Sequence, residues 1–301
     1  MEMDNSRTEF LRYDTTDTND PVTVKNMQEI NETEETRARC LEILRRDLKR
    51  VKDLEPCLDE IFLSPFMRVS KYDTSKAFQR VIKYYQQLDV YLDIYKKFSF
   101  PLQEAESIRH LKLSPYRCAD NSFLLFGKAA IDYRKYTFAH RFYLELVTLH
   151  NFIENPVNQI CGGTFVFDYE GMDIHGYLAF TPSWTRVFVD SLLNTYPCRV
   201  KAIHVVNMPS FFPLLLKVLN QFLPKKIKNR VFFHAKKNDW KDLHASISPE
   251  ILPEKFGGKL KEDELVNIMH DLKAEEEKFL SFFAYGNIKT KKDRLSMKVF
   301  Q

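Results

Sequence analysis

Between residues 123 and 234 the sequence alternates short apolar runs with longer segments whose apolar residues recur at helical spacing. This alternation indicates strands connected by helices, an arrangement that gives a largely parallel sheet. The expected strands are 123–127, 163–168, 200–206 and 231–234. The expected helices are 136–153 and 182–195, the second with Pro182 in its first turn. The pattern therefore predicts an α/β domain.

The segment before this alternation is predicted to be helical, with Leu41, Leu44 and Leu48 on one face. The first 36 residues hold ten acids and three bases with little periodicity, so we expect disorder near the N-terminus. The expected divisions are an acidic disordered tail over 1–33, a helical domain over 34–100, the α/β domain over 101–260, and a C-terminal helix and basic tail over 261–301, with the helix near 262–283.

Residues 199–237 carry nine Lys or Arg and no Asp or Glu, around an apolar middle. Apolar residues flanked by unneutralised cations suit the boundary between hydrocarbon and anionic headgroups. We therefore expect this stretch to dock on a membrane surface. A nucleic-acid partner is disfavoured, because exposed stacking aromatics are not interleaved with the cations.

The apolar middle predicts a helix with one wide apolar face, which either packs in a core or forms a lid over a cavity. The residues of this face are Phe211, Leu215, Val218, Leu219 and Phe222, widened by Phe212, Leu216 and Leu223. Beside it, Lys226 and Arg230 lie one helical turn apart, and Arg199 and Lys201 share a strand face. Converging cations would bind a polyanionic phosphate, although a solvated basic surface is the alternative.

Motifs of the common enzyme classes are absent: there is no G-x-x-x-x-G-K-[ST], G-x-G-x-x-G, G-x-S-x-G or H-E-x-x-H. No His pair shows metal spacing with cysteines, and Asp168 and Glu170 suit a turn cap better than a catalytic pair. We therefore expect no enzyme, no catalytic residues, no metal and no cofactor.

Five scattered cysteines without a C-x-x-C pair favour reduced thiols and a cytoplasmic protein. The N-terminus lacks a signal-peptide core, and no apolar run approaches the roughly 20 residues that span a bilayer. We expect a monomer whose membrane association is peripheral.

Five blocks in order resemble the CRAL-TRIO lipid-binding family, over roughly residues 35–260. They are FVFDYEGM (165–172), TPS (181–183), YPCRVKAIHVVNMPSFF (196–212), FLPKKIKNRVFFH (222–234) and ILPEKFGG (251–258). The chain resembles the subgroup of the alpha-tocopherol transfer protein, cellular retinaldehyde-binding protein and the clavesins. The resemblance implies a helical N-terminal domain and an α/β lipid cage under a mobile gate helix, in proteins that carry one hydrophobic molecule and exchange it at membranes.

The same resemblance implies the site residues. A basic patch for phosphatidylinositol bisphosphate would comprise Arg199, Lys201, Lys226 and Arg230, and the gate would cover about Asn207–Leu223. The implied pocket positions are Phe142, Glu145, Leu149, Phe167, Met172, Phe180, Phe188, Ser191, Leu192 and Tyr196.

Three positions depart from the family pattern. Ser70 stands where the motif beginning at Phe66 has a second Arg, with Lys71 beside it. Glu145 stands at a small or neutral pocket position, where a buried carboxylate needs a partner or a raised pKa. ADNSFLLF (119–126) replaces the turn that usually precedes the first parallel strand.

The sequence thus supports a non-enzymatic carrier of a small hydrophobic lipid, such as a tocopherol, a retinoid, another isoprenoid or a fatty acyl lipid. The main alternative is a lipid-sensing signalling or scaffold module without transfer activity. A hydrolase with an unrecognised site is the third possibility, with no motif behind it.

Overall fold

The computed structural model describes residues 9–97, 110–236, 239–269 and 271–295. A six-stranded sheet forms its centre, in the order β6-β5-β4-β3-β2-β7. The strands are β2 (Leu111–Leu113), β3 (Phe123–Lys128), β4 (Gly163–Asp168), β5 (Val200–Val206), β6 (Val231–Phe233) and β7 (Val266–Asn267). The run from β3 to β6 is parallel, whereas β2 is antiparallel to both of its neighbours. The predicted α/β class, with a largely parallel sheet, is confirmed.

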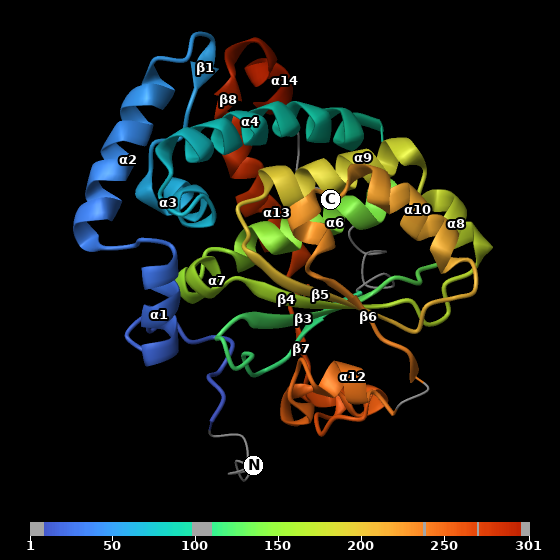
Figure 1. The fold of residues 1–301 in the computed structure, drawn as a ribbon. Coiled ribbons are helices and arrows are strands. Elements are labelled where there is room, and N and C mark those ends of the chain that lie inside the picture. The colour runs from blue at the N-terminus through green and yellow to red at the C-terminus, as the bar shows by residue number, and fades with distance from the viewer. Residues whose placement is uncertain (1–8, 98–109, 237–238, 270, 296–301) are drawn as a thin grey trace.

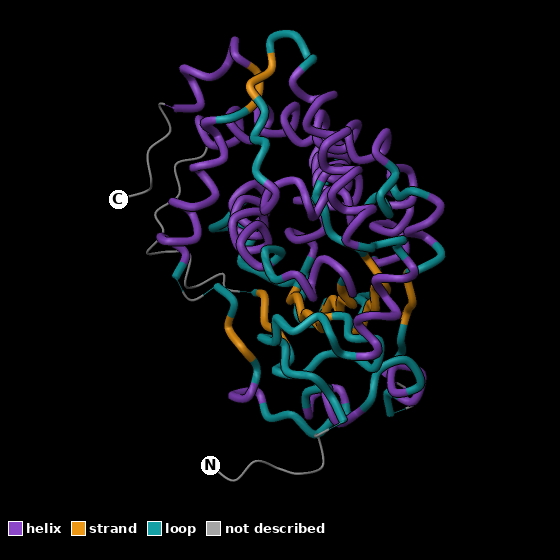
Figure 2. The backbone as a smooth tube through the Cα atoms, turned by 90° about the vertical axis from the view of Figure 1, so that its left-hand side faces the viewer, coloured by secondary structure: helices purple, strands orange, loops and turns teal. Residues whose placement is uncertain are grey.

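Helices cover one face of the sheet, and α12 (Lys241–His244) lies with irregular segments on the other (Figures 1 and 2). The covering helices are α6 (Phe138–Phe152), α8 (Ile174–Ala179), α9 (Pro182–Val189), α10 (Phe212–Phe222) and α13 (Leu272–Ser281). The short α7 (Pro156–Cys161) precedes β4, and α11 (Lys225–Lys228) precedes β6. The predicted helix over 182–195 consists of α9 and a π-helical continuation, Asp190–Thr195.

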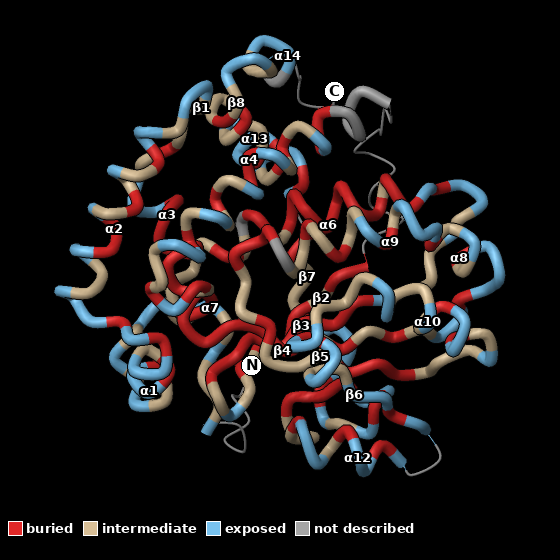
Figure 3. Tube along the Cα trace, turned by 45° about the horizontal axis from the view of Figure 1, so that its top comes forward, coloured by how far each residue is buried: buried red, intermediate tan, exposed pale blue. Residues whose placement is uncertain are grey.

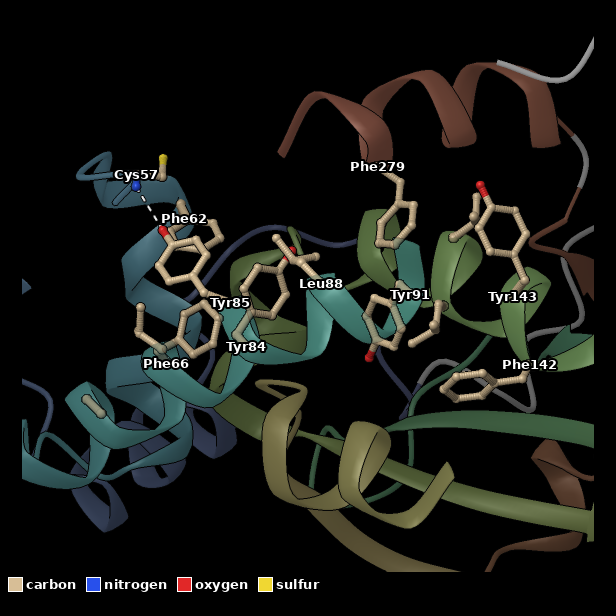
Figure 4. Packing of buried hydrophobic residues seen from close by; sticks show 14 of the residues in the cluster. Cys57, Phe62, Phe66, Tyr84, Tyr85, Leu88, Tyr91, Phe142, Tyr143 and Phe279 are labelled. Carbon is tan, nitrogen blue, oxygen red and sulfur yellow. Dashed lines mark hydrogen bonds between the residues drawn. The ribbon is translucent and has the colours of Figure 1, made fainter. Parts of the chain in front are cut away.

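The helical layer consists of α2 (Glu34–Lys49), α3 (Glu60–Val69) and α4 (Thr74–Lys97). Thr33 caps α2 by accepting a hydrogen bond from the backbone of Thr36, and Glu34 begins the helix, as the helix dipole favours. Aromatic side chains of α3 and α4 continue into α6 and α13 as one buried cluster (Figure 4). Figure 3 shows that burial is concentrated in α6 and the central strands.

The predicted disorder over residues 1–33 is wrong for residues 9–33. Helix α1 (Pro21–Glu29) packs against α7, and Asp20 caps it by accepting from the backbone N–H groups of Val22 and Thr23. The buried Arg117 donates to the main-chain carbonyls of Arg12 and Tyr13. The acids of this segment bind partners far along the chain, which local composition does not reveal.

The C-terminal prediction of one helix over 262–283 is also wrong. This stretch contains β7, which extends the main sheet, and then α13, which packs on α6. Beyond it, β8 (Gly286–Asn287) pairs with β1 (Leu54–Glu55) of the helical layer, and α14 (Lys291–Leu295) follows. The C-terminal segment is therefore part of both packed layers rather than an appendage.

The turn before β3, where the family pattern is lost, is closed by an asparagine. Asn121 has φ 60°, a left-handed conformation that Asn tolerates better than most residues. Its side chain donates to Asp20 Oδ1 (2.6 Å) and Thr23 Oγ1 (2.9 Å), so the turn is fixed to α1.

None of the helices in the described part of the chain combines the length and the hydrophobicity that a membrane span requires.

Candidate functional site

An apolar cavity of about 150 Å³ lies between the sheet and the helices above it. Its floor comes from β3, β4, β5 and β6, and its walls and roof come from α6, α9, the π-helix and α10. Nearly all of its lining is aliphatic or aromatic; the charged exceptions among the described residues are Arg141 and Glu145. This composition suits a hydrophobic molecule with one polar end.

Seven of the ten predicted pocket positions line this cavity. They are Glu145, Leu149, Phe167, Phe180, Phe188, Leu192 and Tyr196. Contact between these residues and a bound molecule stays a prediction.

The other three predicted pocket positions lie outside the lining. Phe142 is fully buried between α4 and α9, with its ring centroid 6.0 Å from that of Tyr91 and 6.1 Å from that of Phe188. Met172 is buried beside α8, in contact range of Gly176. Ser191 is buried and donates its hydroxyl to the Val187 carbonyl (2.6 Å). In the wider π turn the neighbouring side chains Leu192 and Leu193 reach the cavity instead.

The predicted gate is α10, and one half of its apolar stripe faces the cavity. The lining residues are Phe212, Leu216, Leu219 and Leu223, spaced as one helical face requires. Of the remaining predicted gate residues, Leu215 is fully buried and Phe211 packs on Tyr177, with ring centroids 5.7 Å apart. Val218 and Phe222 are partly exposed.

The polar end of the cavity is an ion-paired network around Glu145. Its Oε1 accepts from Arg141 Nε (2.9 Å) and lies 2.8 Å from His110 Nε2. Arg141 Nη1 also donates to the Ala129 carbonyl (2.7 Å). Burial alone would raise the pKa of Glu145, but the Arg141 charge and the His110 hydrogen bond lower it below its ordinary value. The carboxylate partner that the sequence required is thus Arg141, one helical turn away.

The four cations predicted for the basic patch differ in how far acidic and amide side chains already bind them. Lys201 Nζ donates to Asn26 Oδ1 (2.8 Å) and lies 3.5 Å from Asp120 and 3.9 Å from Glu29. Arg199 lies 3.6 Å from Glu29 and donates to the Ile160 carbonyl. Acids and amides of the N-terminal segment and of the turn before β3 therefore already neutralise much of this side.

Lys226 and Arg230 form the other side of the patch. Burial, and then the charges of Arg230, Lys71, Arg199 and Arg80, lower the pKa of Lys226. Lys71 and Arg80 belong to the helical layer, and sequence reasoning did not assign either to the patch. Arg80 offered no signal, because an isolated Arg on a helix usually points into solvent.

Arg68, the arginine of the motif that begins at Phe66, binds other partners and is not part of the basic patch. Arg68 is buried in an ion pair with Glu32, with Nη2 and Oε1 2.6 Å apart, and it also donates to Gln159. Ser70 is buried beside it. The motif therefore fixes α3 to the N-terminal segment and to α7.

The remaining sequence candidates have structural roles. Asp168 Oδ1 accepts from Asn207 Nδ2 (2.9 Å) and from the Glu170 backbone (3.0 Å), so it caps the turn after β4. The described parts of the chain hold no cluster of three or more His, Cys, Asp or Glu that could bind a metal ion.

The CRAL/TRIO domain model matches residues 123–258, the span from β3 to the segment after β6. Clavesin-2 of Homo sapiens is 29% identical over 246 residues, which cover 77% of this chain and 72% of that protein. The alpha-tocopherol transfer protein-like protein of Pongo abelii is 27% identical over 269 residues, covering 88% of this chain and 78% of that one. The crystal structure of Sfh5 aligns with a TM-score of 0.47 and 12% identity, over 83% of this chain and 98% of that one. The family model and these relatives thus agree that residues 123–258 of this chain match a CRAL/TRIO domain.

Proposed function

We propose that this protein is a non-enzymatic carrier that binds one small hydrophobic lipid under α10 and exchanges it at membranes. The observation that carries the proposal is the cavity itself, whose lining is almost entirely apolar in a chain that otherwise packs its aromatic residues tightly. An empty apolar cavity loses dispersion contacts on every wall, and a bound lipid restores them. The resemblance to an alpha-tocopherol transfer protein-like protein supports the same reading.

The cargo class follows from the two ends of the cavity. Arg141 Nη2 and Glu145 Oε2 have no hydrogen-bond partner within the described residues, so one donor and one acceptor remain at the polar end. A lipid with a single hydroxyl, carbonyl or carboxyl group satisfies them while its apolar body fills the rest. Tocopherols, retinoids and other isoprenoids have this polarity, as do fatty acyl lipids, and the cavity of about 150 Å³ would have to widen under α10 to hold one.

Membrane docking is the second part of the proposal. The gate helix α10 leads directly into the cations of α11, so the residues that cover the cargo adjoin those that would meet an anionic surface. At the other end of α10, Leu214 is exposed, and so is Phe233, whose ring centroid lies 5.9 Å from that of Phe212; both suit the interface between headgroups and acyl chains. The carrier would work in the cytosol as a peripheral membrane protein that recognises phosphatidylinositol bisphosphate.

The first test is to purify the full chain from a eukaryotic host, extract it with organic solvent, and identify co-purifying lipids by mass spectrometry. We expect one hydrophobic molecule per chain. A fluorescent analogue of that molecule should then move between donor and acceptor vesicles at a rate that rises with protein concentration. Stoichiometric binding without transfer would favour a lipid sensor, and folded protein that takes up no lipid would overturn the carrier function.

The docking part has its own test. Neutralising Lys226 and Arg230 together should weaken binding to vesicles that contain phosphatidylinositol bisphosphate, while the thermal unfolding midpoint stays near that of the wild type. Unchanged vesicle binding in this double variant would refute the patch assignment and leave the lipid cavity unaffected.

A further inference from the structure

Arg80 is a partly buried cation on α4 without an acidic partner. Its Nη1 donates to the Tyr196 carbonyl (3.0 Å), and within the described residues no carboxylate forms an ion pair with it. Burial lowers the pKa of this guanidinium. A partly buried charge without a counter-ion destabilises the folded chain unless an anion binds it.

The position of Arg80 relates it to the patch. It donates to the carbonyl of Tyr196, and Arg230 donates to the carbonyl of Val200, at the two ends of the segment 196–200, whose last residue begins β5. Between them, the Cys198 thiol experiences the charges of both Arg80 and Arg199. The main-chain carbonyls therefore orient these guanidinium groups and leave N–H groups free for a ligand.

Lys201, unlike Arg80, already has acidic partners. Its ammonium is held by Asn26, Asp120 and Glu29, and the side chain is only 21% exposed. A phosphate that recruited Lys201 would have to displace a hydrogen bond of 2.8 Å and two acidic neighbours. Lys201, which the sequence placed in the patch, is thus less available to a phosphate than Arg80, which the sequence did not place there.

We propose that the anion site of this chain lies at the junction of α4, the segment 196–200 and α11, with Arg80 as a headgroup ligand in place of Lys201. Arg80, Lys226 and Arg230 contact the phosphates, and Arg199 and Lys71 add to the positive field. Two guanidinium groups beside an ammonium suit the paired phosphates of a phosphatidylinositol bisphosphate headgroup. The inference rests on the proposed docking function and names the residues that perform it.

The consequence for the carrier is a link between its two layers. Arg80 belongs to the helical layer, whereas Lys226 follows the gate helix by four residues. A headgroup bound by both fixes the end of α10 relative to α4. Membrane engagement is thereby communicated to the roof of the cavity.

The experiment compares four full-length proteins: wild type, Arg80→Gln, Arg80→Lys and Lys201→Gln. Binding is measured to phosphatidylcholine vesicles with and without phosphatidylinositol bisphosphate, across a range of salt concentrations. We expect Arg80→Gln to weaken binding by about tenfold and to make its salt dependence shallower, because one charge-assisted contact is lost. Arg80→Lys should recover part of the affinity, and Lys201→Gln should bind like the wild type.

A second measurement separates a headgroup ligand from a merely structural arginine. Soluble inositol trisphosphate should raise the thermal unfolding midpoint of the wild type and of Lys201→Gln, and raise it less for Arg80→Gln. If Lys201→Gln loses binding while Arg80→Gln keeps it, the inference is overturned. If the wild type responds to inositol trisphosphate through Arg80 but ignores the vesicles, the site binds a soluble phosphate and the docking proposal fails instead.

Discussion

The helical layer and the α/β domain both bury many aromatic side chains, but they leave different amounts of space beside them. The cavity under α10 measures about 150 Å³, whereas the void beside Phe62, Phe66 and Tyr84 in the aromatic cluster measures about 30 Å³. In that cluster Phe62 has the rings of Phe66, Tyr84 and Phe282 within 5.5 Å of its own centroid. The difference shows that aromatic content alone does not determine packing.

The cavity exists because the elements that face each other across it do not interdigitate. Phe165 and Phe167 stack in one layer on the sheet, with centroids 6.2 Å apart, and the lining residues of α10 are leucines apart from Phe212. In the helical layer, Phe62 and Phe66 of α3 both meet Tyr84 of α4 edge to face, which fills volume efficiently. The same residue types therefore make a packed core in one layer and line a cavity in the other.

The largest expected effect on stability comes from truncating an aromatic residue of the packed cluster, compared with truncating one that lines the cavity. Phe66→Ala should cost about 3–5 kcal/mol of unfolding free energy, because Phe66 is fully buried among other rings. Phe167→Ala should cost about 1 kcal/mol or less, because its ring already borders a void. Urea unfolding of both variants measures the difference, and equal losses would contradict the comparison.

The second largest expected effect is a loss of stability at acid pH, through His150 in the packed aromatic cluster. Burial among Tyr84, Phe279 and Phe282 lowers the pKa of His150 to about 3. The unfolded chain, with an ordinary histidine pKa of about 6.5, binds the proton more readily, so stability is complete above that pH and falls by about 1.4 kcal/mol per pH unit below it. A His150→Phe variant should show a shallower loss between pH 6.5 and 4, measured by denaturant unfolding.

His204 is expected to add to the same acid dependence from the other face of the sheet. Burial and the neighbouring His234 lower its pKa to about 4. The His150→Phe variant should therefore retain part of the slope. A profile in which His150→Phe removes all of the acid dependence would show that the histidine pair contributes nothing.

The smallest change in stability, and the sharpest change in binding, should come from filling the cavity. Leu219→Trp adds volume where space exists, so we expect lipid uptake to fall strongly while the unfolding free energy changes by about 1 kcal/mol or less. Leu214→Trp is the matched control on the same helix, because Leu214 is 55% exposed. Titration with a fluorescent lipid distinguishes them; equal losses of uptake would mean that α10 does not cover the cargo.

Periodicity predicted the parallel strands and the apolar helix α10 because these elements are apolar and bounded by turn residues. It missed β2, which is a three-residue strand defined by its partners rather than by its own pattern. It also read the first 33 residues as disordered, since Glu29 and Glu32 bind Arg199 and Arg68 through contacts that composition does not encode. The sequence also offers no indication of Arg80, because its contact with the Tyr196 carbonyl exists only in the folded chain.

The pairing of β1 with β8 brings an early segment of the chain against a late one. The late helix α13 also contributes Phe279 to the buried aromatic cluster that includes residues of α3, α4 and α6 (Figure 4). A fragment that stops after the matched domain at residue 258 would lose β7, Phe279 and the buried Glu276 that accepts from the Tyr143 hydroxyl. Such a fragment would expose rings of α4 and α6 to water and aggregate. The stability of the matched domain thus depends on residues that lie outside residues 123–258.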